Sequence, residues 1–285
     1  MKINIGSAAL LVEVNISSWS ARKLDKKVTE EVNQNKGASR SASRTNKNLL
    51  ADDEKLEAIN KFAANFRNWL YAETLPWSNS GLRLIPTAKF FDFKTTMDKY
   101  KNEFEQLVSE FVTEYPNRIA AQAFKLGSMF DRNEYPQQDE IANKFKFSYC
   151  FSPVPEAGHF LVDLGEEMEK ELKAEYEKAY EDRVNGAMKD LWVRLKDSLD
   201  KIAERLTPDE SGKNKIFRDS LVDNVLDLCG MLRELNVTND PNLEKARREV
   251  EMLLSGVVAE DLRKNDDIRK DVRSEVAAIL DKFAW

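Results

Sequence analysis

Cysteine, histidine, glycine and proline are all scarce in this chain of 285 residues, which has 2 Cys, 1 His, 10 Gly and 8 Pro. The two cysteines, Cys150 and Cys229, form no C-x-x-C pair, so neither a disulfide framework nor a cysteine metal site is expected. No two glycines have the spacing of a phosphate-binding loop or of a dinucleotide fingerprint. The sequence motifs that most often indicate a nucleotide-binding site or a metal site are therefore missing.

Catalysis by a Ser-His-Asp or Cys-His arrangement would have to use His159, the single histidine. His159 follows a Pro-rich turn (Pro153, Pro155) at the expected start of a strand, and we interpret it as a structural residue. The sequence thus predicts a protein that is not an enzyme and that needs no cofactor.

Long hydrophobic runs are also missing. The apolar run Ala8 to Ile16 is interrupted by Glu13 and Asn15, and it fits neither a signal sequence nor a membrane span. We therefore expect no membrane association and a cytoplasmic location.

Charged residues make up 33% of the chain and hydrophobic residues 42%, a composition typical of long solvated helices that still bury a core. We predict an α+β fold that is predominantly α-helical. Its head, residues 1–165, contains a small antiparallel sheet together with a basic N-terminal helix and loop. Its tail, residues 166–285, is helical and begins with a long antiparallel hairpin over 166–235.

In the head, Ala8 to Ile16 reads as a strand, and Ser17 or Ser18 caps a helix to about Asn35 with a basic face. Residues 37–48 read as a loop, which is flexible unless a partner orders it. Further predicted helices are one capped by Asp52 or Asp53, one from about Lys89 to Tyr115 that the following proline ends, and one over 117–130. The predicted strands are a strictly alternating strand over 144–152 and a second strand over 159–164.

In the tail, apolar residues recur every three or four positions along one long helix from Glu166 to Leu206, which predicts a coiled-coil seam. The seam comprises Val184, Met188, Leu191, Leu195, Leu199, Ile202 and Leu206. A polar turn at 207–214 reverses the chain, and 216–235 forms the second arm, which packs against the first or presents a surface to a protein partner or a second copy.

Charge is unevenly distributed. Eight Lys and Arg and three acidic residues give residues 17–50 a net +5, which leaves −11 for the rest of a chain whose total is −6. Phosphates are neutralised by several cations on one face, and sequence-tolerant binding of single strands adds aromatic rings on which bases stack. The candidate nucleic-acid-binding residues are Trp19, Arg22, Lys23, Lys26, Lys27, Arg40, Arg44 and Lys47. The alternative is that the lysines solubilise a surface helix and that the tryptophans belong to the core.

Another candidate is a helical face with Asp219, Asp223 and Asp227 at successive turns, which could offer oxygen ligands to a divalent cation. A solvated face is the favoured interpretation, because no second carboxylate cluster converges on it.

Six short motifs together resemble a family of phage and prophage proteins of unknown function. They are Trp19-Ser20-Ala21-Arg22-Lys23-Leu24-Asp25-Lys26-Lys27, Asn46-Lys47-x-Leu49-Leu50, Thr74-Leu75-Pro76-Trp77, Arg83-x-x-Pro86, Tyr135-Pro136 and Pro153-Val154-Pro155. Genes of that family are sometimes found near a MoxR-type AAA+ ATPase and a von Willebrand-type protein. The resemblance implies a viral origin and an adaptor role, and it supplies no catalytic residues. The leading hypothesis is a non-enzymatic phage protein that binds single-stranded nucleic acid in replication or recombination. The alternative is an adaptor, or an inhibitor of a host factor, that acts through the helical hairpin.

Overall fold

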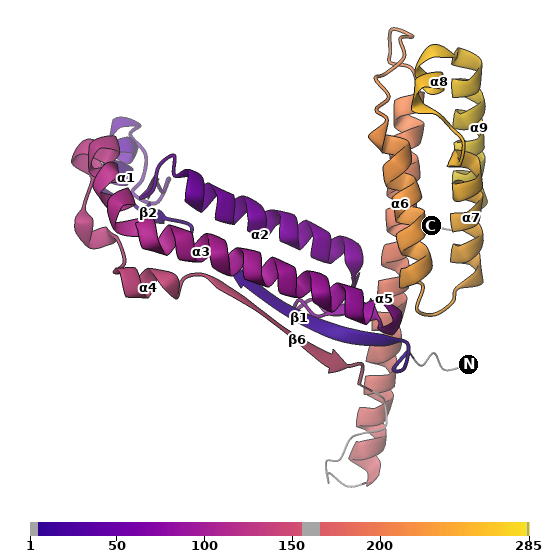
Figure 1. Ribbon diagram of the computed structural model, residues 1–285, viewed down its shortest axis with the longest axis horizontal. Coiled ribbons are helices and arrows are strands. Elements are labelled where there is room, and N and C mark those ends of the chain that lie inside the picture. Colours follow the sequence, from indigo (N-terminus) through magenta and orange to yellow (C-terminus); the bar gives the residue numbers. More distant parts are fainter. Residues whose placement is uncertain (1–4, 156–165, 284) are drawn as a thin grey trace. The chain divides into compact units, whose positions relative to one another are not determined.

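The computed structural model describes residues 5–155, 166–283 and 285 and confirms an α+β fold that is 65% helical (Figure 1). Contacts divide the chain into two compact units. Unit 1 contains the described residues of 1–13, 70–93 and 150–285, and unit 2 contains 14–69 and 94–149. Neither unit begins or ends at residue 165. A boundary between folding domains at that residue stays a prediction.

The larger sheet has four antiparallel strands in the order β4-β5-β1-β6. The strands are β1 (Ala9–Ser17), β4 (Leu75–Pro76), β5 (Arg83–Pro86) and β6 (Lys146–Pro153). In β1, Ala9 and Leu11 are buried, and the strand pairs with β5 from Ala9 opposite Pro86 to Val12 opposite Arg83. The strands predicted near residues 8–16 and 144–152 are thus confirmed, and the strand predicted at 159–164, with His159, lies outside the described residues.

The first long helix, α2 (Glu54–Glu73), begins as the sequence predicts. Asp53 caps it, because the Asp53 carboxylate accepts the N–H of Leu56 at 3.0 Å and is held by Arg118 at 2.8 Å. The residues that the sequence places on its apolar face are buried: Leu56, Ile59, Phe62, Phe66 and Leu70.

The helix α3 (Phe90–Leu126) contains Pro116 inside its span, so the prediction that this helix ends before Pro116 is wrong. Proline has no N–H to donate to the carbonyl four residues earlier, which is that of Val112. In the structure, the side-chain amide of Gln138 donates to the Val112 carbonyl at 3.0 Å. A partner from outside the helix therefore satisfies the group that proline leaves open, and the helix continues.

In unit 1, α5 (Glu166–Leu206) packs against α6 (Ser220–Leu235), and α7 (Pro241–Leu254) and α9 (Asp266–Lys282) complete a helical bundle (Figure 1). All seven predicted seam residues of α5 are buried, from Val184 to Leu206. The long antiparallel hairpin of α5 and α6 is confirmed. Within the same chain, α6 and α9 cover the apolar seam of α5.

Short elements connect these parts. They are the 3₁₀ turns Thr87–Lys89, Gly127–Met129 and Arg132–Glu134, and the helices α4 (Gln138–Ala142) and α8 (Ala259–Lys264). Within the described residues, none of the helices combines the length and the apolar character needed to cross a membrane.

Candidate nucleic-acid interface

The basic segment of residues 17–50 folds differently from the sequence prediction. A strand, β2 (Arg22–Leu24), pairs antiparallel with β3 (Asn46–Asn48), and helix α1 (Lys26–Asn35) begins only after β2 and lies between the two strands in the sequence. The prediction of one helix from Ser17 or Ser18 to Asn35 is therefore wrong. Ala21 adopts a φ of 51°, which is outside the right-handed helical region, and the Asp25 carboxylate accepts the N–H of Val28 at 3.0 Å and caps α1.

Polar side chains, rather than apolar ones, fix the segment between α1 and β3. The buried side chain of Asn33 donates to the Arg40 carbonyl at 3.2 Å and accepts from the Ser43 hydroxyl at 2.6 Å. The Thr29 hydroxyl accepts the N–H of Thr45 at 3.0 Å. Apolar packing contributes little here, because Val32 of α1 is 39% exposed. These hydrogen bonds hold Arg40, Ser43 and Thr45 against α1.

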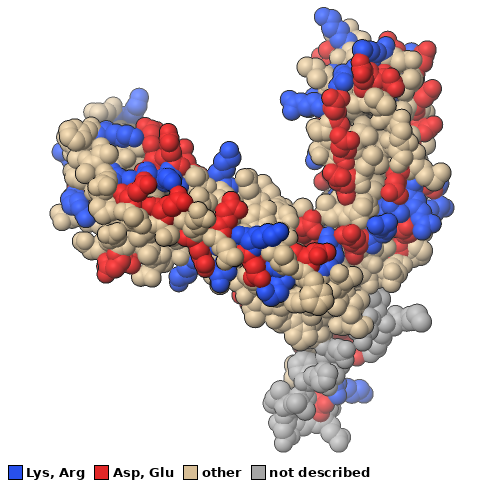
Figure 2. Space-filling model, in the orientation of Figure 1, with Lys and Arg blue, Asp and Glu red and all other residues tan. Residues whose placement is uncertain are grey.

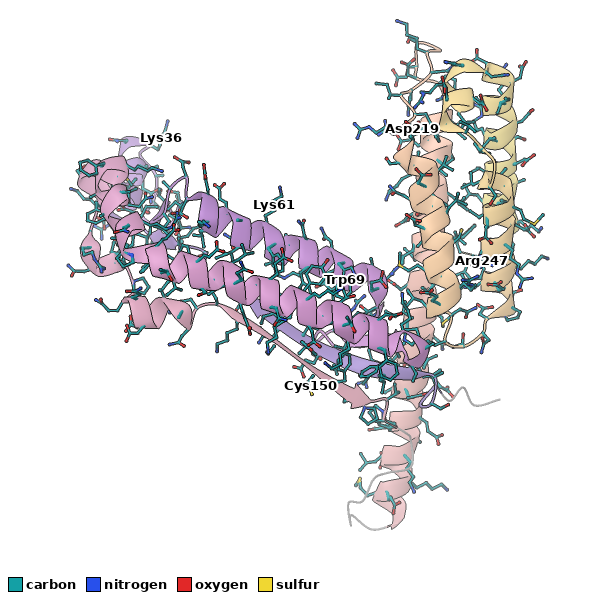
Figure 3. All side chains as sticks on the ribbon, viewed as in Figure 1. Lys36, Lys61, Trp69, Cys150, Asp219 and Arg247 are labelled. Carbon is teal, nitrogen blue, oxygen red and sulfur yellow. The ribbon has the colours of Figure 1, made fainter. Side chains whose placement is uncertain are left out.

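Six of the seven predicted cationic contacts lie on the surface of this segment. Their side chains are exposed: Arg22, Lys23, Lys26, Lys27, Arg40 and Arg44. Among the described residues, only Lys23 of these six has an acidic neighbour within ion-pair distance, the Glu134 carboxylate at 3.9 Å. The exposed Lys36, at the end of α1, adds a further cation (Figure 3). The charge of this segment is thus available to an anion.

Lys47 is the exception among the predicted cations. Its side chain is only 7% exposed and forms ion pairs with Glu134 and, at 3.9 Å, with Asp25. Its ammonium group also donates to the Met129 carbonyl at 2.9 Å. Because a buried ammonium that is already paired gains little from a phosphate, Lys47 stabilises the β2–β3 sheet instead of facing solvent.

Trp19 is half-buried and also differs from the expectation that it stacks freely on the basic face. Its ring lies edge-to-face with Tyr115, with 6.0 Å between the ring centroids. Burial raises the pKa of the Tyr115 hydroxyl to about 12, and this hydroxyl donates to the Pro136 carbonyl at 3.2 Å. One side of the Trp19 ring therefore packs against Tyr115 and is not free to stack on a base.

An exposed aromatic residue that the sequence reasoning missed lies on the last turns of α3. Phe124 is 93% exposed. Its neighbours Gln122 and Lys125 both donate to the Ala51 carbonyl, at 3.1 and 3.0 Å, which ties this end of α3 to the chain that follows β3. A signal was available, because a helical projection places Phe124 away from the buried Ile119.

Figure 2 shows Lys and Arg interspersed with Asp and Glu over the face in view, without a broad area of one sign. Because the chain as a whole has a net charge of −6, electrostatic attraction to a polyanion depends on the particular cations of residues 22–44.

The acidic face of α6 has a local explanation. Asp219 forms an ion pair with Arg263 at 2.7 Å. Within the described residues, no group of three or more His, Cys, Asp or Glu side chains is arranged to hold a metal ion. The face that begins at Asp219 thus gives no support to a metal site.

No family model matches the chain, and neither a curated protein nor a solved structure shows significant similarity to it. The resemblance to phage and prophage proteins therefore stays a prediction, and function must be argued from the chain's own residues.

Proposed function

We propose that this protein is a non-enzymatic phage protein that binds single-stranded nucleic acid through the surface formed by β2, α1 and the segment 36–44. The observation that carries the proposal is the group of exposed cations on an ordered scaffold, five of which have no acidic partner among the described residues: Arg22, Lys26, Lys27, Arg40 and Arg44. Such a group exchanges counterions for phosphates.

Each part of the surface has a distinct role. The cations contact phosphates, and Phe124 supplies the exposed ring on which a base stacks. Lys47 and Trp19 hold the scaffold from within. Unpaired bases are needed for stacking, because bases in a duplex are already stacked on each other, so single strands are preferred over duplexes. Replication or recombination in the cytoplasm of an infected host cell is the setting in which such strands occur.

The test is fluorescence anisotropy of labelled single-stranded and double-stranded DNA over a salt titration. We compare the triple variant Arg22→Gln, Lys26→Gln, Lys27→Gln with a matched control, Lys61→Gln, Lys99→Gln, Lys144→Gln, which removes the same charge from exposed positions elsewhere in unit 2. Each lost phosphate contact lowers the slope of log K against log salt by about 0.7. We expect a slope reduced by about 2 in the first variant and a much smaller change in the control.

Phe124→Ala separates stacking from charge. The variant should weaken single-strand binding by about 1 to 3 kcal/mol and leave the salt slope unchanged, whereas Phe124→Trp should retain binding. Equal affinity of the wild type and of the triple cation variant for single strands would remove the proposal.

The alternative proposal is an adaptor, for example of a AAA+ ATPase, or an inhibitor of a host factor. The seam of the hairpin is covered within the chain, so a partner has to use exposed apolar side chains outside it, such as Ile216 and Met252, each 80% exposed. Pull-down from infected cells with the wild type and with Ile216→Asp, Met252→Asp tests this role, because a specific partner should be lost only from the variant.

A further inference from the structure

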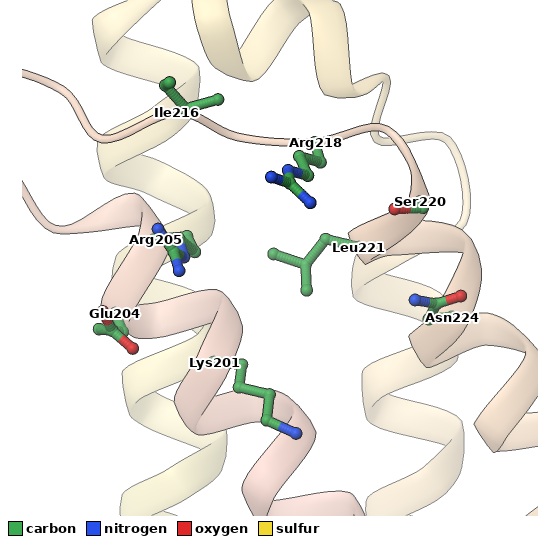
Figure 4. Close-up of a pocket in the computed structure, with 8 residues that line it drawn as sticks. All are labelled: Lys201, Glu204, Arg205, Ile216, Arg218, Ser220, Leu221 and Asn224. Atoms are coloured by element: carbon green, nitrogen blue, oxygen red, sulfur yellow. The ribbon is translucent and has the colours of Figure 1, made fainter. Parts of the chain in front are cut away.

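A cavity lies at the closed end of the helical hairpin, between the last turns of α5 and the start of α6. It has a volume of about 530 Å³. Its lining residues are Lys201, Glu204, Arg205, Ile216, Arg218, Ser220, Leu221 and Asn224. Figure 4 shows Lys201 and Arg205 on α5, Arg218 on the segment that precedes α6, and Leu221 on α6.

The chain around the cavity is held by two arginines, of which Arg269 is buried and Arg263 is exposed. Arg269, 3% exposed, donates to the carbonyls of Leu206 and Lys215, each at 3.1 Å, and also to the carbonyl of Arg205. Arg263 donates to the Phe217 carbonyl at 3.1 Å. The residues that carry the cations of the cavity therefore lie next to anchored backbone, which reduces the entropy lost when a ligand binds.

Charge in the cavity is unbalanced. Lys201, Arg205 and Arg218 line it against one carboxylate, that of Glu204, and this carboxylate accepts a hydrogen bond from Lys215 at 3.3 Å. Within the described chain, the three cationic side chains have no hydrogen-bond or ion-pair partner. Lys201 and Arg205 are also like charges one helical turn apart on an exposed helix face, an arrangement that is slightly unfavourable.

An oligophosphate matches these groups. A guanidinium group binds phosphate oxygens through two parallel N–H donors, and the cavity offers two such groups, one from α5 and one from the segment before α6, together with an ammonium. The Ser220 hydroxyl and the Asn224 amide add neutral donors, while Leu221 and the 80% exposed Ile216 form an apolar wall. The volume lies within the range of about 300 to 1,000 Å³ that is typical of small-molecule sites.

We propose that this cavity binds the oligophosphate group of a small organic molecule. The phosphates contact Arg205, Arg218 and Lys201, and the organic part lies against Ile216 and Leu221. This site belongs to unit 1, whereas the nucleic-acid surface proposed above belongs to unit 2. A negative result for one proposal therefore leaves the other proposal unaffected.

The test is isothermal titration calorimetry of the full chain with three probes, namely inorganic tripolyphosphate, adenosine triphosphate and adenosine, without divalent cations. The cavity variant is Arg205→Gln, Arg218→Gln. Its matched control is Lys189→Gln, Arg233→Gln, which removes the same charge from exposed positions of α5 and α6 outside the cavity. Thermal unfolding of both variants establishes that they are folded.

We expect both phosphate probes to bind the wild type and the control, and to bind the cavity variant at least tenfold more weakly. Adenosine alone should not bind, and Ile216→Ala should weaken adenosine triphosphate more than tripolyphosphate. No binding of either phosphate probe, or an equal loss in the cavity and control variants, would overturn the proposal. So would a loss of single-stranded DNA binding in the cavity variant without any binding of the small probes, because the cavity would then belong to a nucleic-acid surface.

Discussion

Two buried arginines, Arg247 and Arg269, stabilise unit 1 through different kinds of acceptor. Arg247 lies on α7 (Figure 3) and donates to the Glu244 carboxylate at 2.8 and 2.9 Å and to Glu251 at 2.7 Å. Arg269 instead donates to main-chain carbonyls, and its burial lowers the pKa of its guanidinium. A buried guanidinium needs most of its donors satisfied, and the two sites achieve this with carboxylates and with helix ends, respectively.

The Arg247–Glu244 pair predicts a pH dependence of stability. The hydrogen bond from Arg247 lowers the pKa of Glu244 from 4.5 to about 2. A carboxyl group whose pKa is lowered by folding stabilises the folded state fully above pH 4.5, and this contribution is lost as the pH falls toward 2. We expect the difference in urea midpoint between the wild type and Glu244→Gln to be largest at neutral pH and to shrink below pH 4.5.

A matched control for this measurement is Glu260→Gln, which removes an ion pair with Lys264 whose two side chains are 56% and 73% exposed. Exposed pairs contribute little, so this variant should follow the wild type at all pH values. A difference for Glu244→Gln that stays constant from neutral to acid pH would contradict the assignment.

At the scale of elements, α3 is a helix that continues through Pro116, although proline usually ends a helix. Proline disfavours the helix because its ring clashes with the carbonyl four residues earlier and because it lacks an N–H. Here Gln138, at the first position of α4, reaches the carbonyl of Val112. The prediction failed because the residue that completes the hydrogen bonding lies outside the helix.

A double-mutant cycle tests this explanation. Gln138→Ala should destabilise the wild type by about 1 kcal/mol, because the Val112 carbonyl loses its partner within the protein. In a Pro116→Ala background the new N–H satisfies that carbonyl, so Gln138→Ala should have an effect near zero. Denaturant unfolding of the four proteins measures the coupling, and additive effects of the two substitutions would show that Gln138 does not compensate for the proline.

The segment of residues 17–50 shows the same limit of local reasoning. Arg22, Lys23 and Leu24 fit a helical projection, yet they form a strand because Asn46–Asn48 lies alongside them. That pairing also places Lys23 opposite Lys47. A run of like charge thus divides into exposed cations and one buried cation, and this division decides which residues can meet a phosphate.

At the scale of the whole molecule, the core of unit 1 is assembled from distant parts of the sequence. Ala9, Leu11, Leu75, Trp77 and Leu84 share one buried cluster with the seam of α5. The helices after residue 165 thus cover apolar residues that precede it.

A chain ended at residue 165 tests whether the head folds alone. Without α5, the cluster residues Leu75, Trp77 and Leu84, none more than 3% exposed, lose much of their apolar cover. We therefore expect the truncated chain to bind the dye ANS strongly and to lack a single cooperative unfolding transition. A cooperative transition without dye binding would instead support a domain boundary at residue 165.

The sequence by itself determined the elements whose signal is a local period. The seam from Val184 to Leu206, the apolar face of α2 and the alternation of β6 are visible because helix and strand geometry repeat every 3.6 and 2 residues. From these periods followed the α+β class, the dominance of helix and the antiparallel hairpin.

Tertiary structure alone decided the features that depend on residues far apart in the chain. These are the pairing of β2 with β3 and the burial of Lys47 against Glu134. They also include the hydrogen bond from Gln138 to the Val112 carbonyl, which Pro116 leaves without its helical donor, and the position of Arg205 and Arg218 at one cavity. No local period encodes them, because each arises when the packing of larger elements brings a donor and an acceptor, or two like charges, into the same place.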